Sequence, residues 1–241
     1  MNRYKDVLAL IQETNKQYEE VIGLYDKALR DKSLDIRIKV KNLMENLRSI
    51  LDYTARDIYE SACRPHREKL NKPNPRNIYF PYGRYEEDFK SSITNSLPDL
   101  EVLCQPIYKI IKEVQPFVSS NPWICDLCTI NNENKHDRLI PQTRDEVETY
   151  TVEGNQGSVS VIVNNPNVQV TSQPGAVRIF GVPAQFTPEG IKTAPSNLKH
   201  KRTFWVSFVF EGTSINVLAL LKIAVPKVEA LVTSIYIELC I

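Results

Sequence analysis

The sequence has no long apolar run. Its longest one, residues 215–224, is interrupted by Asn216 and Lys222, and a membrane-spanning helix needs roughly 20 apolar residues in a row. The first residues are charged and lack the apolar segment of a secretory signal. Five cysteines form an odd, sparse set, which favours reduced thiols over a disulfide framework. These absences predict a cytoplasmic protein that makes no contact with a membrane.

Glycine is scarce and scattered along the chain. The 8 glycines form no phosphate-binding loop, and no Gly-x-Ser-x-Gly motif occurs. Kinases, nucleotide-dependent ATPases and dinucleotide enzymes are therefore not expected, and no cofactor is predicted. A net charge of +1 shows no basic excess, so any contact with nucleic acid must come from a local patch.

The first 142 residues have the periodicity of amphipathic helices. Residues 4–29 predict a long helix, because apolar residues with helical spacing form a stripe on which only Asn15 is polar. The stripe consists of Tyr4, Leu8, Ile11, Tyr18, Ile22, Tyr25 and Leu29. A second helix, at about residues 34–62, aligns a continuous apolar face: Val40, Leu43, Met44, Leu47, Leu51, Ala55 and Ile58. The short connection predicts an antiparallel hairpin. After a proline-rich loop that contains Phe80 and Pro81, further helices are expected at about residues 100–113 and 122–139.

The pattern of residue types changes after residue 142. Short β-branched runs separated by Gly, Pro and Asn predict an antiparallel meander, and residues 204–210 predict a strong strand after a break at about 187–201. A final helix is expected at about 215–240, but Pro226 leaves open whether the residues after it form helix or strand. The predicted fold class is α+β.

Two domains are expected within this fold. Residues 1–142 form an N-terminal antiparallel helical bundle in this prediction. Residues 143–241 form a small antiparallel β-sheet region whose C-terminal helix packs back.

Two pairs of residues have the spacing of zinc ligands. Cys63 and His66, and likewise Cys125 and Cys128, are separated by two residues, as in a tetrahedral zinc site. Zinc knuckles usually bend through Gly or Pro, whereas Cys125 and Cys128 lie in a helical pattern without Gly. Small buried hydrophobes on a helix face are therefore the favoured interpretation. No metal site is predicted, and zinc remains the alternative.

Polar residues gather in NNENKHDRLIPQ, at the end of the helix expected at 122–139. Asn131 and Lys135 share a helix face, and the pKa range of His136 suits general acid–base chemistry near neutral pH. Arg48 and Asp52, one turn apart on the second helix, can pair with each other or point together into a groove. A helix C-terminus also favours such residues for structural reasons.

Catalysis would give each of these residues a distinct role. His136 would be the general acid or base, and Lys135 and Arg48 would contact a phosphate. Asp52 and Asn131 would orient the reacting groups. The structural interpretation and the catalytic one both remain open from the sequence.

Three stretches resemble, in order, the motifs of a widespread group of bacterial proteins. NLRSILDYTARDIYE corresponds to an Arg-x-x-Leu-Asp helix, IYFPYG to a Phe-Pro segment, and WICDLCTINNENKHDRL to a helix that ends in Asn-x-x-Lys-His. The likeness covers about residues 35–140. The helical half is also loosely similar to the HEPN domains of toxin–antitoxin and phage-defence systems. HEPN RNases carry Arg four to six residues before His, where this chain has Asn131 before His136.

Two functions of different classes are expected, the first implied by the resemblance and the second by the long N-terminal hairpin and the β-rich half. The first is a HEPN-like protein of bacterial stress or phage defence, acting on RNA as a metal-independent RNase. The second is a non-catalytic interaction module that binds a ligand or a partner protein from the same operon. Homo-oligomers are expected in either case, because exposed strand edges and a long amphipathic hairpin favour self-association.

Overall fold

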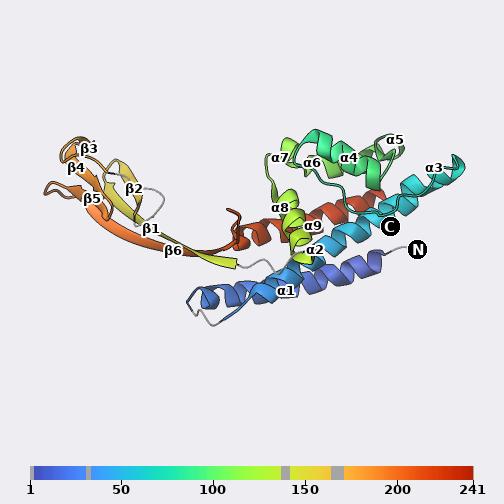
Figure 1. Ribbon diagram of the computed structural model, residues 1–241, viewed down its shortest axis with the longest axis horizontal. Helices are drawn as coiled ribbons and strands as arrows, with labels where there is room; N and C mark the ends of the chain where they lie inside the picture. Colours follow the sequence, from blue (N-terminus) through green and yellow to red (C-terminus); the bar gives the residue numbers. More distant parts are fainter. Residues whose placement is uncertain (1–2, 31–33, 137–141, 164–170, 241) are drawn as a thin grey trace. The chain divides into compact units, whose positions relative to one another are not determined.

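Helices and strands occupy separate parts of the chain in the computed structural model, which describes residues 3–30, 34–136, 142–163 and 171–240 (Figure 1). Residues Met1–Gln142 and Val209–Ile241 form a helical unit, and Thr143–Phe208 form a β unit. The β unit is thus inserted between two stretches of the helical unit. The sequence-based boundary assigned all of 143–241 to the β-rich domain, whereas the structure groups the C-terminal helix with the helical unit.

Three long helices form the centre of the helical unit: α1 (Tyr4–Arg30), α2 (Arg37–Ile58) and α9 (Val217–Glu238). Arg3, just before α1, pairs with Asp57 near the end of α2, and Glu20 of α1 pairs with Lys39 near the start of α2. The two helices are therefore antiparallel, as predicted. The expected apolar face of α2 is buried along its whole length, and α9 packs against both helices (Figure 1).

Helix α9 continues through Pro226, which settles the question that the sequence left open. Its buried residues recur with helical spacing from Val217 to Tyr236, whereas Pro226 itself is exposed. A proline is tolerated there because Pro226 and Lys222, whose carbonyl loses its hydrogen bond, are both exposed residues outside the core. Among the described residues, no helix combines the length and the apolar character that crossing a membrane requires.

A second layer of shorter helices follows α2. The π-helix η1 (Tyr59–Cys63) and α3 (Arg64–Lys69) extend it, and the chain then forms an extended segment at residues 78–83. The remaining helices are α4 (Glu86–Ser96), α5 (Leu100–Leu103), α6 (Gln105–Glu113), α7 (Pro116–Ser119) and α8 (Trp123–His136). The predicted helix at 100–113 is divided at Cys104, and α4 was not predicted. The end of the helix expected at 122–139 lies outside the described residues.

The β unit contains two small sheets. The first has the strand order β2-β1-β6 and the second β3-β4-β5, with β1 (Gln142–Gly154), β2 (Gly157–Val163), β3 (Val177–Ile179), β4 (Val182–Thr187), β5 (Gly190–Thr193) and β6 (Lys199–Phe210). Val152, Ile179, Ala184 and Ile191 form their common core. The break expected at about 187–201 is wrong, because β5 and the start of β6 lie within it.

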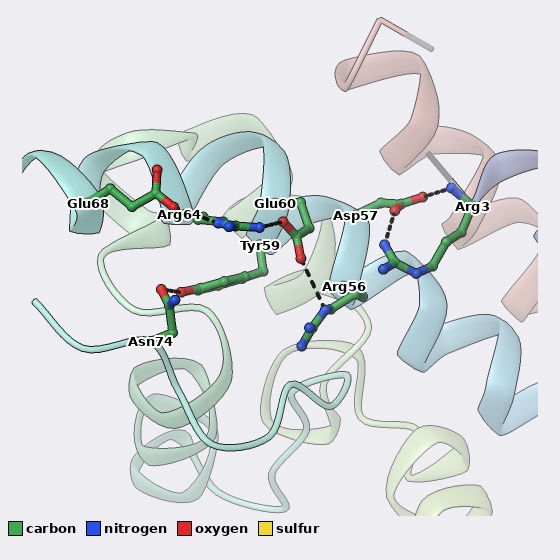
Figure 2. A network of polar contacts seen from close by, with 8 residues as sticks. All are labelled: Arg3, Arg56, Asp57, Tyr59, Glu60, Arg64, Glu68 and Asn74. Carbon is green, nitrogen blue, oxygen red and sulfur yellow. Dashed lines mark hydrogen bonds and ion pairs between the residues drawn. The ribbon is translucent and has the colours of Figure 1, made fainter. Parts of the chain in front are cut away.

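A buried carboxylate joins the three long helices, and Figure 2 shows its contacts with Arg3. Asp57 is 2% exposed and accepts hydrogen bonds from the backbone N–H of Arg3 at 2.9 Å and from its Nη1 at 2.8 Å. The hydroxyl of Tyr236 donates a third at 2.8 Å. A buried charge is costly unless it is paired and hydrogen-bonded. Asp57 meets that condition only when α1, α2 and α9 are all in place.

Candidate functional site

A cavity of about 430 Å³ lies in the helical unit between α2, the extended segment at residues 78–83, α4 and α8. It is lined by Arg48, Asp52, Tyr79, Phe80, Tyr82, Ser92, Asn95, Ser96 and Asn132. Its volume falls in the range of roughly 300–1,000 Å³ that is typical of small-ligand sites. The cavity therefore has the size and the mixed polar and aromatic lining of a binding site.

Arg48 lies at the base of this cavity and is 4% exposed. Its Nε donates to Oδ2 of Asp52 at 3.0 Å, its Nη2 lies 3.0 Å from Oδ1 of Asp52, and its Nη1 donates to Sγ of Cys128 at 2.6 Å. Burial alone would lower the pKa of Arg48, but Cys128 and Asp52 raise it above its ordinary value. The guanidinium therefore stays charged, and each of its three nitrogens has a partner within the protein.

Two tyrosine rings flank the same guanidinium. The centroid of the Tyr82 ring lies 5.4 Å from the Arg48 Cζ, and that of Tyr79 lies 6.0 Å away. Both distances are within the range of a cation–π interaction, which Arg makes more often than Lys. Arg48 thus holds two aromatic side chains of the extended segment against α2.

Side chains from α2, from α4 and from the connection between α6 and α7 fix the backbone of that extended segment. Asp52 of α2 accepts from the N–H of Phe80 at 2.8 Å, Ser92 of α4 accepts from Tyr82 at 3.3 Å, and Gln115 accepts from Gly83 at 3.1 Å. A Cβ at Gly83 would come within 2.3 Å of the backbone N of Phe89, so only glycine fits this close approach. The segment is therefore a fixed wall of the cavity.

The groups that a ligand can reach are aromatic rings, amides and hydroxyls. Tyr79 is 53% exposed, and Asn95 and Asn132 are exposed on α4 and α8. Nδ2 of Asn132 donates to the hydroxyl of Tyr82 at 3.1 Å. Burial raises the pKa of Tyr82, so this hydroxyl stays protonated near neutral pH. The accessible surface of the cavity is polar but carries little net charge.

The five residues predicted as a catalytic cluster have different places in the structure. Arg48 and Asp52 pair with each other, which was one of the two expected arrangements. Arg48 also contacts α8 through Cys128. Asn131 is 0% exposed, and neither polar atom of its side chain has a hydrogen-bond partner among the described residues. The amide that α8 contributes to the cavity is that of Asn132. Lys135 and His136 end α8, and their side chains lie outside the described residues.

The side chains that α4 contributes to the cavity, Ser92, Asn95 and Ser96, were not predicted because α4 itself was not. One signal was present: Glu86, Glu87 and Asp88 form an acidic first turn, which favours a helix N-terminus. Asp88 also accepts from the backbone N–H of Tyr85 as part of a capping box. The side chains of Ser92 and Asn95 follow on that helix.

The two pairs with zinc-ligand spacing do not form a metal site in the part of the chain that the structure describes. No three His, Cys, Asp or Glu side chains gather there in a way that could hold an ion. Burial raises the pKa of Cys63 to about 12 and that of Cys125 to about 11. Both thiols are therefore neutral near pH 7, as expected for buried hydrophobes.

Residues from the three stretches NLRSILDYTARDIYE, IYFPYG and WICDLCTINNENKHDRL meet at this cavity. Arg48 and Asp52 come from the first stretch, Phe80 from the second, and Cys128 and Asn132 from the third. Segments that are far apart in the chain thus build one site. No protein-family model, curated protein or solved structure matches this chain.

Proposed function

We propose that the helical unit is a non-catalytic binding module whose cavity takes one planar, polar group, such as an unpaired base of RNA. Three accessible groups support this proposal. The half-exposed ring of Tyr79 offers a face for stacking, and the amides of Asn95 and Asn132 can bond the edges of a base. Aromatic stacking combined with hydrogen bonds to base edges is how proteins recognise single-stranded RNA.

The observation that carries the proposal is that all three nitrogens of Arg48 already have partners within the protein. Its nitrogens contact the Asp52 carboxylate and the Cys128 sulfur, and two tyrosine rings flank it. A guanidinium that contacts a scissile phosphate needs free N–H groups directed at the ligand. The partners of Arg48 favour a role in building the cavity wall, and they argue against Arg48 and Asp52 taking part in a reaction.

A second candidate is the metal-independent RNase of a HEPN-like defence protein. One observation favours it: Asn132 lines the cavity, and His136 follows one helical turn later at the end of α8. The chain has Asn131 where HEPN RNases carry their arginine, so this candidate needs Lys135 as the phosphate contact. It ranks second because Arg48 is already engaged.

Fluorescence anisotropy with labelled single-stranded RNA tests the binding module. We expect the full-length protein to bind single strands more tightly than duplex RNA, in which the bases are stacked and paired. Tyr79→Ala should weaken binding about tenfold, because stacking on an aromatic ring is worth about 1–3 kcal/mol per base. The matched control is Tyr53→Ala, since Tyr53 is 41% exposed on α2 and lies outside the cavity lining. Equal affinity of wild type and Tyr79→Ala would contradict the proposal.

A further inference from the structure

A second cavity, of about 320 Å³, lies in the β unit, where three connections between strands converge. It is lined by Gly154, Asn155, Gln156, Phe180, Val182, Ser196, Asn197 and Leu198. Gly154 ends β1, and Asn155 and Gln156 connect it to β2. Phe180 belongs to the connection between β3 and β4, and Ser196 to Leu198 belong to the loop before β6. Loops that a sheet scaffold holds together in this way are frequent sites of recognition.

The polar part of this lining is neutral. Asn155 and Gln156 form a two-residue connection, because Gly154 pairs with Gly157 across the hairpin, and both side chains are exposed. Ser196 and Asn197 are exposed on the opposing loop. The amides offer donors and acceptors together, and the hydroxyl does the same. None of the lining residues carries a charge, so the cavity suits an uncharged ligand with many hydroxyl or amide groups.

Phe180 provides the apolar wall from an unusual backbone position. It has φ of 49° and is followed by Gly181 with φ of 80°, in the two-residue connection that joins the paired residues Ile179 and Val182. Two successive positive φ values define a turn that favours Asn-Gly, and a bulky aromatic residue is rare there. Backbone conformations of this kind tend to persist where a side chain has a function.

The Phe180 ring also depends on the absence of a side chain at Gly154. A Cβ added to Gly154 would come within 2.7 Å of Cδ2 of Phe180 and 3.1 Å of Cδ2 of Leu198. The ring is only partly buried against the core of the β unit. Gly154 therefore lets a flat apolar surface lie beside the amides of the hairpin.

We propose that this cavity binds a neutral saccharide. The C–H face of a sugar ring packs on an aromatic ring, while its hydroxyls exchange hydrogen bonds with amide and hydroxyl side chains. Phe180 supplies the ring, and Asn155, Gln156 and Asn197 supply the amides. The absence of charged groups from the lining favours neutral sugars over uronic acids, sugar phosphates and amino sugars.

Saturation-transfer NMR with the full-length protein tests this assignment. The probes are glucose, galactose, mannose and N-acetylglucosamine, with glucuronic acid and glucose 6-phosphate as charged comparisons. We expect at least one neutral sugar to bind at millimolar concentration, with saturation strongest on its ring C–H protons. Absence of binding by all four neutral sugars, or stronger binding of the charged pair, would overturn the proposal.

Three variants locate the binding site. Asn197→Ala should weaken binding severalfold, because it removes one exposed amide. Phe180→Leu keeps an apolar side chain for the core but loses the flat face, so binding should fall at least as much. Gln173→Ala is the matched control, since Gln173 is exposed in the same unit and lies outside the lining. Circular dichroism checks that each variant is folded, and unchanged affinity in folded Asn197→Ala and Phe180→Leu would also overturn the proposal.

Discussion

The Asp57 carboxylate of α2 accepts a hydrogen bond from the hydroxyl of Tyr236 on α9, at 2.8 Å and across 179 positions of sequence. The same carboxylate receives two hydrogen bonds from Arg3 at the start of α1. One buried acidic side chain thus connects the first, second and last helices of the helical unit.

Replacing this carboxylate should destabilise the helical unit strongly. We expect Asp57→Ala to lower the free energy of unfolding by about 2–4 kcal/mol, because three hydrogen bonds are lost and their donors stay in a largely buried place. Urea denaturation followed by circular dichroism measures the change. The control is Glu68→Ala, which removes an exposed partner of Arg64 (Figure 2) and should change stability little. Similar effects of the two variants would argue against the central role of Asp57.

Stability should fall at alkaline pH partly through Tyr236. Burial, then the hydrogen bond to Asp57 and the charge of Asp57, raises the pKa of Tyr236 above its ordinary value of 10.0. The folded state therefore holds this proton more tightly than the unfolded state does. The resulting stabilisation is complete below about pH 10 and is lost as the pH rises further toward the folded-state pKa.

Tyr236→Phe isolates that contribution. The variant should be less stable than wild type by about 1 kcal/mol at neutral pH, because it loses one hydrogen bond. Its stability should then decline less steeply than that of wild type between about pH 10 and about pH 12. Urea titrations across this interval provide the comparison. Parallel declines in the two proteins would show that Tyr236 titrates normally.

Arg48 should not be replaceable by lysine. Lysine keeps the charge but cannot contact Asp52 and Cys128 at once, and it lacks the flat guanidinium that lies by Tyr79 and Tyr82. We expect Arg48→Lys to lower the free energy of unfolding by about 2 kcal/mol and to weaken RNA binding as the cavity wall loosens. Arg56→Lys is the matched control, because Arg56 is 43% exposed and pairs only with Glu60 among the described ion pairs. Undiminished stability of Arg48→Lys would favour a direct role in ligand contact.

Thiol labelling should distinguish the exposed cysteine from the three buried ones. Cys240 is exposed, whereas Cys63, Cys125 and Cys128 are buried. The raised pKa values of Cys63 and Cys125, about 12 and about 11, keep them as unreactive neutral thiols near pH 7. Iodoacetamide followed by mass spectrometry should modify Cys240 first and the buried three only in guanidinium chloride. Rapid modification of Cys63 in the native protein would contradict its buried place.

An RNA-cleavage assay distinguishes the binding module from the RNase. We expect wild type and His136→Ala to leave labelled single-stranded RNA equally intact in the presence of EDTA. Lys135→Ala serves as a second variant of the same helix end. Metal-independent cleavage by wild type that is lost in His136→Ala would instead support the RNase and assign His136 to the reaction.

The long helices were the most predictable part of the fold, and α2 shows why. Its apolar residues define one face over many turns, and all seven that were predicted to be buried are buried. The buried face of α1 was harder to predict, because apolar residues occur on several sides of this helix. Val7 and Val21 are buried and Leu8 is 39% exposed, contrary to the predicted stripe. The packing of both α2 and α9 against α1 selects the buried face.

The short strands and the cavity depend on tertiary contacts, which cannot be inferred from the local sequence pattern. Strand β4 carries Pro183 and β5 has only 4 residues, so both are too brief for periodicity to show. The pairing of Arg48 with Asp52 followed from helical spacing, whereas the sulfur of Cys128 as a partner required the packing of α2 on α8. Tyr79 and Tyr82, which flank Arg48, were likewise unpredictable, because the extended segment that carries them shows no periodic pattern of apolar residues.

The insertion of the β unit has a consequence for synthesis of the protein. Helix α9 leaves the ribosome only after all of the β unit, so the apolar faces of α1 and α2 lack their third partner during this interval. At ~5–20 residues per second, the wait lasts several seconds. The nascent helical unit is therefore a natural client for chaperones, and slow codons in the stretch before α9 would prolong its exposure to aggregation.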